Sequence, residues 1–125
     1  MIPTWVLYVD GSSNSQGGGA GIILTTPEGV QLEHALRFGF KSSNNKAEYE
    51  ALLVGLQLAT ALGAEQIRVF SDSQLVVNQV LQQYKACKDN MVAYLTLVHS
   101  ITGKLKGIFV TQIPREENAQ ANRLS

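Results

Sequence analysis

The sequence predicts an α/β domain built on a five-stranded mixed sheet, three antiparallel strands followed by parallel strands, with helices on both faces. Apolar runs rich in β-formers alternate with helical patterns in the order β-β-β-α-β-α-α-β-α. The first helix follows a three-strand meander, and a crossover of this kind places the fourth strand parallel to the first. With 125 residues, we expect one domain over 1–125 whose last helix is cut short.

The strands are predicted from apolar runs that end in turn residues. The first run, 5–9, is expected to stop in a turn formed by Asp10–Asn14 and the glycines at 17–19. Turn residues at Pro27–Gly29 predict a hairpin between the second and third strands. The remaining strands are expected at 21–26, 30–40, 66–71 and 108–113.

The helices are predicted from apolar spacing and from capping residues. The cluster Ser42–Asn45 favours a helix start that places Glu48 in the first turn, and Gly63 is a typical residue just past a helix end. The later helices are expected from Ser73 to about residue 82, over 90–102 and over 117–124.

Composition limits the classes of function without choosing one. The longest apolar runs are too short to cross a bilayer, and no secretory signal precedes them, so we expect an intracellular, cytoplasmic monomer without a membrane partner. The single Cys87 excludes an internal disulfide. The net charge is zero, but setting aside Asp10, Glu48 and Asp72 leaves seven acidic residues against ten Lys and Arg. The charge therefore neither supports nor excludes a nucleic-acid substrate.

Three acidic side chains are predicted to meet at one edge of the sheet. Asp10 and Asp72 follow the first and fourth strands, whose carboxyl ends are expected side by side. Glu48 shares a helix face with Leu52 and Leu56, the face that must pack on the sheet. Each Asp alone is explained as a strand-end or cap residue, and Glu48 as a partner of the helix dipole. The dipole does not explain why Glu48 lies on the buried face.

Carboxylates brought to one point repel one another, and hard divalent cations remove that repulsion. Oxygen ligands suit Mg²⁺ or Mn²⁺, whereas the absence of a Cys-His set excludes a zinc site. Two such ions about 3.5–4 Å apart can activate a water and stabilise the leaving oxygen of a phosphodiester. The three carboxylates thus indicate metal-dependent phosphoryl chemistry.

Four segments of the chain resemble type 1 ribonuclease H in their order, spacing and context. They are Tyr8–Ser12, Asn44–Glu48, Phe70–Gln74 and Ile113–Asn122. The chain looks most like the ribonuclease H domains of plant long-terminal-repeat retroelement polyproteins. The resemblance implies an endonuclease with the ribonuclease H-like fold that hydrolyses the RNA strand of RNA/DNA hybrids. It also implies two Mg²⁺ ions, with Mn²⁺ as a substitute, and a fused or associated reverse transcriptase.

The same resemblance implies a role for each matching position. Asp10, Glu48 and Asp72 match catalytic metal ligands, with Asp10 bridging both ions. Asn122 stands where the family has a fourth ligand, an Asp. The positions that match nucleic-acid contacts are Gly11, Ser12, Asn14, Ser43, Asn44, Asn45, Gln74 and Asn118.

Asn122 leaves two interpretations open. An Asn keeps the shape of the carboxylate but removes its charge, so we expect reduced or abolished cleavage. The alternative is a catalytically inactive module that binds RNA/DNA hybrids.

The family's His near the last motif is also absent, and Gln112 and Arg115 are the nearest polar residues. The segment Tyr84–Asn90 is short and has few basic residues, which predicts weak hybrid binding unless another domain helps.

Overall fold

The computed structural model describes residues 2–14, 17–38, 43–81 and 89–125. Its helices and strands follow the predicted order, with one short 3₁₀ helix added. In chain order they are β1 (Trp5–Asn14), β2 (Gly17–Thr25), β3 (Gln31–Phe38), α1 (Asn44–Ala61), β4 (Gln66–Ser71), α2 (Gln74–Val80), α3 (Asp89–Thr102), β5 (Gly107–Gln112), the 3₁₀ helix η1 (Arg115–Asn118) and α4 (Ala119–Leu124).

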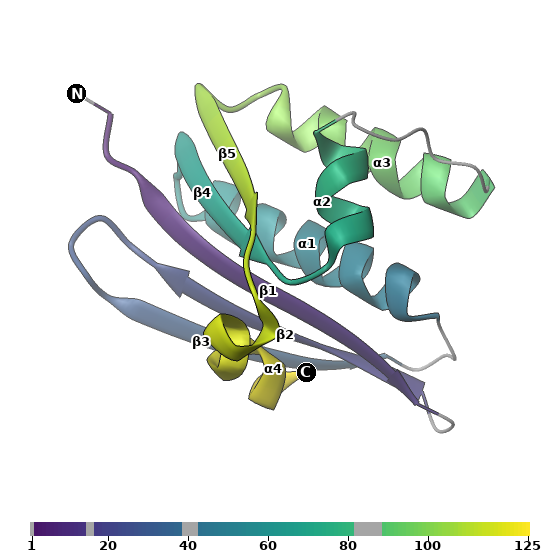
Figure 1. Ribbon diagram of the computed structural model, residues 1–125. Coiled ribbons are helices and arrows are strands. Elements are labelled where there is room, and N and C mark those ends of the chain that lie inside the picture. Colours follow the sequence, from purple (N-terminus) through teal and green to yellow (C-terminus); the bar gives the residue numbers. More distant parts are fainter. Residues whose placement is uncertain (1, 15–16, 39–42, 82–88) are drawn as a thin grey trace.

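The strands form one mixed sheet in the order β3-β2-β1-β4-β5. β1 pairs antiparallel with β2, and β2 pairs antiparallel with β3. On its other side β1 pairs parallel with β4, which pairs parallel with β5. Figure 1 shows α1, α2 and α3 on one face of this sheet and α4 on the other. The predicted fold class is confirmed.

The core lies between α1 and the central strands. α1 packs closely on β1 because Gly55 has no side chain: a Cβ there would stand 3.0 Å from both methyl groups of Leu7. Leu52, Leu56 and Ala59 continue the same buried face of the helix. Burying one large apolar side chain contributes about 1.5–3 kcal/mol, so this interface fixes α1 over β1.

The first strand is longer than the sequence predicted. β1 stays paired with β2 out to Asn14, opposite Gly17, so the expected turn at Asp10–Asn14 is wrong. At least two of the glycines serve close packing here instead of turn formation. A Cβ on Gly11 would lie 2.3 Å from the carbonyl of Ala47 in α1. Glycines are typical of turns, but here Gly11 lets α1 approach β1, and Gly19 lets Ser125 approach β2.

The start of α1 also differs from the prediction. Ser43 caps the helix by accepting a hydrogen bond from the backbone N–H of Lys46, and α1 begins at Asn44. Glu48 therefore lies in the second turn, beyond the range in which the helix dipole acts strongly on a carboxylate. The placement of Glu48 in the first turn was wrong, and the dipole does not account for it.

Smaller differences concern the ends of elements. β3 ends at Phe38 and α2 at Val80, both earlier than predicted, and the predicted remainders at 39–40 and 82 lie outside the described residues. Most of the segment with few basic residues, 84–88, also lies outside them. α4 begins at Ala119, two residues later than predicted. Among the helices that the structure describes, none has the length and apolar character of a bilayer span.

Candidate metal and nucleic-acid site

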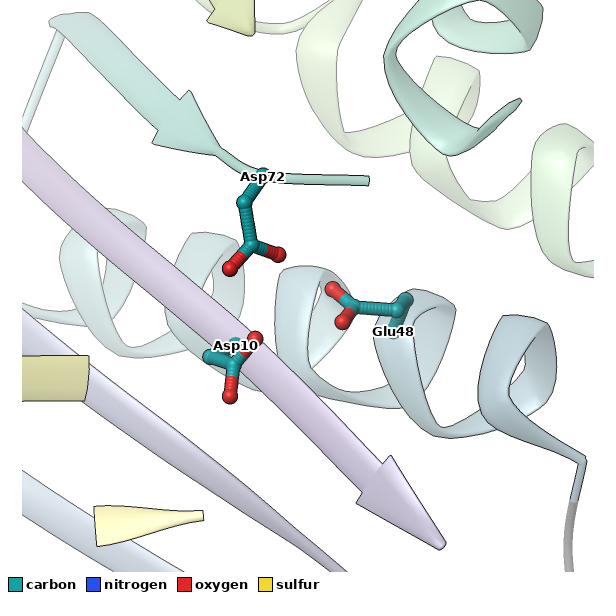
Figure 2. Close-up of side chains that lie close together, drawn as sticks. All are labelled: Asp10, Glu48 and Asp72. Atoms are coloured by element: carbon teal, nitrogen blue, oxygen red, sulfur yellow. The ribbon is translucent and has the colours of Figure 1, made fainter. Parts of the chain in front are cut away.

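Asp10, Glu48 and Asp72 come together at the end of the parallel β1–β4 ladder. The ladder ends at Val9 opposite Ser71, and Asp10 and Asp72 are the residues that directly follow this last pair. One carboxylate oxygen from each of the three residues lies within 4.8 Å of the others (Figure 2). Asp10 is 3% exposed and Glu48 7%. The predicted convergence of the three carboxylates is confirmed.

A glycine brings Glu48 to this point. Gly11 directly follows Asp10, and a Cβ on it would lie 2.5 Å from the backbone nitrogen of Glu48. Any larger residue would push the N-terminal half of α1 away from β1. The closeness of helix and strand thus turns the Glu48 side chain into the space beside Asp10 and Asp72.

Burial and mutual repulsion make this cluster hold protons tightly. Burial, and then the charge of Asp10, raise the pKa of Glu48 to about 9, although a hydrogen bond from the backbone of Gly11 opposes the shift. Burial and the charge of Asp10 also raise the pKa of Asp72, against a hydrogen bond from Asn118 and the charge of Arg115. Without a cation, Glu48 is therefore protonated at neutral pH.

The oxygens of the cluster fit a hard divalent cation. Within the part of the chain that the structure describes, Glu48 Oε2 and Asp72 Oδ2 are buried and have no hydrogen-bond partner. A buried acceptor without a partner costs about 1–3 kcal/mol. Mg²⁺ and Mn²⁺ bind carboxylate oxygens of this kind, so a divalent ion would satisfy atoms that the protein leaves unsatisfied.

Asn122 lies beside Asp10, where the sequence placed it. Its Nδ2 donates to Asp10 Oδ2 at 3.1 Å. The hydroxyl of Ser125, which caps α4, lies 2.8 Å from the same oxygen. Both donors come from the segment that packs on the opposite face of the sheet from α1 (Figure 1).

Asn118 has a different place from the one expected. It is 1% exposed, and its Nδ2 donates to the backbone oxygen of Val9 at 2.9 Å. It also forms a hydrogen bond with the Asp72 carboxylate. A buried side chain cannot meet a nucleic acid directly, so the expected nucleic-acid contact is wrong. Asn118 instead ties η1 to β1 and to Asp72.

A cavity of about 330 Å³ opens beside the carboxylates. Its lining consists of Gly11, Ser12, Ser13, Asn44, Asn45, Glu48, Asp72, Ser73 and Arg115. Hydroxyl and amide groups thus surround the acidic cluster. Within this lining, Ser13 donates to Asn44 Oδ1 at 2.6 Å, which links β1 to the start of α1.

Of the eight expected nucleic-acid contacts, four line this cavity. Gly11, Ser12, Asn44 and Asn45 belong to the lining. Ser43 and Gln74 are exposed at the starts of α1 and α2. Asn14 ends β1, and its side chain lies outside the described residues.

Sequence reasoning missed several residues at the site. Ser13 and Ser73 adjoin recognised motifs and line the cavity, so adjacency was the available signal. Arg115, which the sequence indicated only as a polar residue near the position of the absent His, also lines the cavity, and its charge opposes the rise in the pKa of Asp72. No sequence pattern indicated Ser125, because only the packing of α4 brings it to Asp10.

Three solved structures resemble the chain over almost its whole length. RNase H1 from the archaeon Halobacterium salinarum NRC-1 is 26% identical with a TM-score of 0.90, covering 97% of this chain and 93% of that one. The N-terminal RNase H domain of Rv2228c from Mycobacterium tuberculosis is 30% identical with a TM-score of 0.90, covering 97% and 95%. LC11-RNase H1 in complex with an RNA/DNA hybrid is 28% identical with a TM-score of 0.86, covering 96% and 92%.

Full-length relatives are longer than this chain. The bifunctional protein Rv2228c of Mycobacterium tuberculosis is 29% identical over 123 residues, which are 96% of this chain but 34% of that protein. Ribonuclease HI of Halobacterium salinarum is 26% identical over 121 residues, 94% of this chain and 60% of that protein. The family described as reverse transcriptase-like matches residues 8–125. The chain therefore belongs to this reverse transcriptase-like, ribonuclease H-like family.

Proposed function

We propose that the chain hydrolyses the RNA strand of RNA/DNA hybrids with divalent ions held by Asp10, Glu48 and Asp72. The observation that carries the proposal is the pair of buried, unpartnered oxygens on Glu48 and Asp72. They lie beside a cavity lined by hydroxyl and amide groups. Relatives of the same fold are ribonucleases H, and one of them was solved with an RNA/DNA hybrid.

The chemistry divides between the ions and the side chains. When bound, divalent ions at such a site lower the pKa of an attacking water and neutralise charge on the leaving oxygen. The carboxylates hold the ions, while Asn44 and Asn45 offer amide groups at the cavity wall. Only RNA carries the 2′-hydroxyl that such groups can read, so we infer a preference for the hybrid over duplex DNA.

Asn122 would lower the activity instead of changing the substrate. A neutral amide would give any second divalent ion less electrostatic support than a carboxylate at this position would. Removing one electrostatic stabiliser of a transition state costs about 10²–10³-fold in rate, which is the reduction we expect with Mg²⁺. Mn²⁺ would recover part of it, because oxygen and nitrogen sites bind Mn²⁺ more tightly than the strongly hydrated Mg²⁺.

A second candidate is a module that binds the hybrid without cutting it. The hydrogen bond from Asn122 to Asp10 favours it, because that contact engages an oxygen of a metal ligand. The two candidates share a substrate and differ only in turnover.

The resemblance to plant long-terminal-repeat retroelements adds a further proposal, that a fused or associated reverse transcriptase delivers the hybrid.

The test is cleavage of a labelled RNA/DNA hybrid by this chain and by Asn122→Asp, in Mg²⁺ and in Mn²⁺. We expect slow cleavage by the wild type and a sharp gain for the variant in Mg²⁺. Duplex DNA and single-stranded RNA of the same sequence serve as control substrates. Hybrid binding without cleavage by either protein would support the non-cutting module, and the absence of both binding and cleavage would refute the proposal.

A further inference from the structure

Two side chains at the end of α4, those of Asn122 and Ser125, donate hydrogen bonds to the same carboxylate oxygen of Asp10. Asn122 Nδ2 lies 3.1 Å from Asp10 Oδ2, and Ser125 Oγ lies 2.8 Å from it. A carboxylate oxygen has two lone-pair directions, so two donors fill it. Figure 2 shows one oxygen of Asp10 directed towards Glu48 and Asp72 and the other directed away from them.

The side-chain N–H of Asn122 offsets the negative charge of the Asp10 carboxylate, as a cation would if residue 122 were acidic. A carboxylate only accepts hydrogen bonds, so the amide must present Nδ2 and not its oxygen to Asp10. An Asp at position 122 would bring two negative oxygens about 3 Å apart, which is stable only with a proton or cation between them. The N–H of Asn122 supplies the missing positive end without an ion.

Ser125 completes this arrangement. Its Oγ lies near both Asp10 Oδ2 and the backbone oxygen of Asn122, at 2.8 and 2.9 Å. The hydroxyl has one proton, and the charged carboxylate is the stronger acceptor. Ser125 lies close to β2, because a Cβ on Gly19 would stand 3.1 Å from its carbonyl carbon. The backbone N–H of Ser125 also donates to Ala121.

We propose that Asn122 and Ser125 together occupy both acceptor directions of Asp10 Oδ2, so that this oxygen cannot bind a metal ion. The chain then has a single divalent-ion site. The site consists of the other oxygen of Asp10 with Glu48 and Asp72. Asp10 then cannot bridge two ions. Ser125 acts through Asp10 and is a positioning residue. The inference rests on the proposed function, because it specifies how many ions the same carboxylates hold.

The test counts Mn²⁺ ions bound to the chain without nucleic acid, by calorimetry and by electron paramagnetic resonance. Two Mn²⁺ about 4 Å apart couple magnetically and give a spectrum unlike that of an isolated ion. We expect one uncoupled Mn²⁺ in the wild type. The double variant Asn122→Asp with Ser125→Ala is expected to bind two coupled ions.

Single variants separate the two donors. In Asn122→Asp alone, Ser125 still competes for Oδ2, so the second Mn²⁺ should bind at least about tenfold more weakly than in the double variant. Ser125→Thr in that background keeps the hydroxyl and should leave this weakening in place. Ser100→Ala, an exposed serine of α3, is the matched control and should change nothing.

Several outcomes would overturn the inference. One is a coupled pair of Mn²⁺ in the wild type, and another is a single ion in a double variant that circular dichroism shows to be folded. Should that variant unfold, replacing both donors by Ala frees Oδ2 without adding charge and should still admit a weak second ion. No bound Mn²⁺ in the wild type contradicts the proposed function as well. One bound Mn²⁺ without hybrid cleavage supports the inference and contradicts only the proposed activity.

Discussion

Gly21 of β2 and Ala121 of α4 are in such close contact that a Cβ on Gly21 would stand 1.9 Å from the carbonyl oxygen of Ala121. This contact sets the height of α4 above the sheet. It therefore also sets the reach of Asn122 and Ser125 to Asp10.

Gly21→Ala is expected to lift α4 from the sheet and to separate Asn122 from Asp10. Overpacking of this kind costs about 1–3 kcal/mol, and a backbone neighbour cannot move aside as a side chain can. Urea unfolding measures the loss, and the side-chain amide resonances of Asn122 report the broken contact. Gly107→Ala is the control, because its added Cβ would meet only the flexible side chain of Gln66. Equal destabilisation by both variants would contradict the role of the Gly21 contact.

Glu48 predicts a specific dependence of stability on pH. Its pKa is raised from 4.5 to about 9 by burial, so the folded state holds this proton more tightly than the unfolded state. The free energy of unfolding of the metal-free chain should therefore fall as pH rises from about 4.5 through about 9. Glu48→Gln, which keeps a neutral side chain, should remove much of that fall. Unfolding in urea at a series of pH values measures it.

The control for Glu48→Gln is Glu28→Gln, an exposed residue that precedes β3. That variant should keep the pH profile of the wild type. Adding Mg²⁺ at pH 8 should stabilise the wild type and release a proton, which calorimetry in buffers of different ionisation enthalpy detects. Parallel pH profiles for the wild type and Glu48→Gln would show that Glu48 does not hold the proton.

The sequence was sufficient for the order of the strands and for the convergence of the carboxylates. Asp10 and Asp72 could be placed together because parallel strands end at the same edge of a sheet. The paired hairpin after Asp10 could not be foreseen, since Gly11 and its neighbours have turn composition. Gly11 instead allows close contact between the backbones of β1 and α1, and that contact depends on a helix distant in the sequence. The burial of Asn118 depends likewise on the packing of η1 against β1.

Arg115 is expected to strengthen hybrid binding. It is exposed, lines the cavity, and lowers the pKa of Asp72 through its charge. A cation here can contact a backbone phosphate, so Arg115→Ala should weaken hybrid affinity and reduce the salt slope by about one. Fluorescence anisotropy at several salt concentrations measures both. Arg68→Ala, an exposed arginine of β4 outside the cavity lining, is the control. An unchanged salt slope in Arg115→Ala would rule out the phosphate contact.

Ser13 is expected to contribute to discrimination between RNA/DNA hybrid and duplex DNA. It donates to Asn44 Oδ1 at 2.6 Å, which fixes the orientation of the Asn44 amide, and Asn44 lines the cavity. We expect Asn44 Nδ2 to donate to the nucleic acid in this orientation. A ribose 2′-hydroxyl can accept from that group, whereas deoxyribose cannot. Ser13→Ala lets the amide rotate, so some molecules will present the oxygen instead. An exposed hydrogen bond contributes about 0.5–1 kcal/mol, so the ratio of hybrid to DNA affinity should fall about two- to fivefold.

Anisotropy with hybrid and duplex DNA of one sequence measures this ratio for each variant. Asn44→Ala should lower it at least as far, and combining it with Ser13→Ala should add little, because Ser13 acts through Asn44. Ser100→Ala controls for the loss of a hydroxyl elsewhere on the surface. If Ser13→Ala weakens both duplexes equally, Ser13 stabilises only the start of α1. If the two variants add fully, Ser13 contacts the nucleic acid itself and does not orient Asn44.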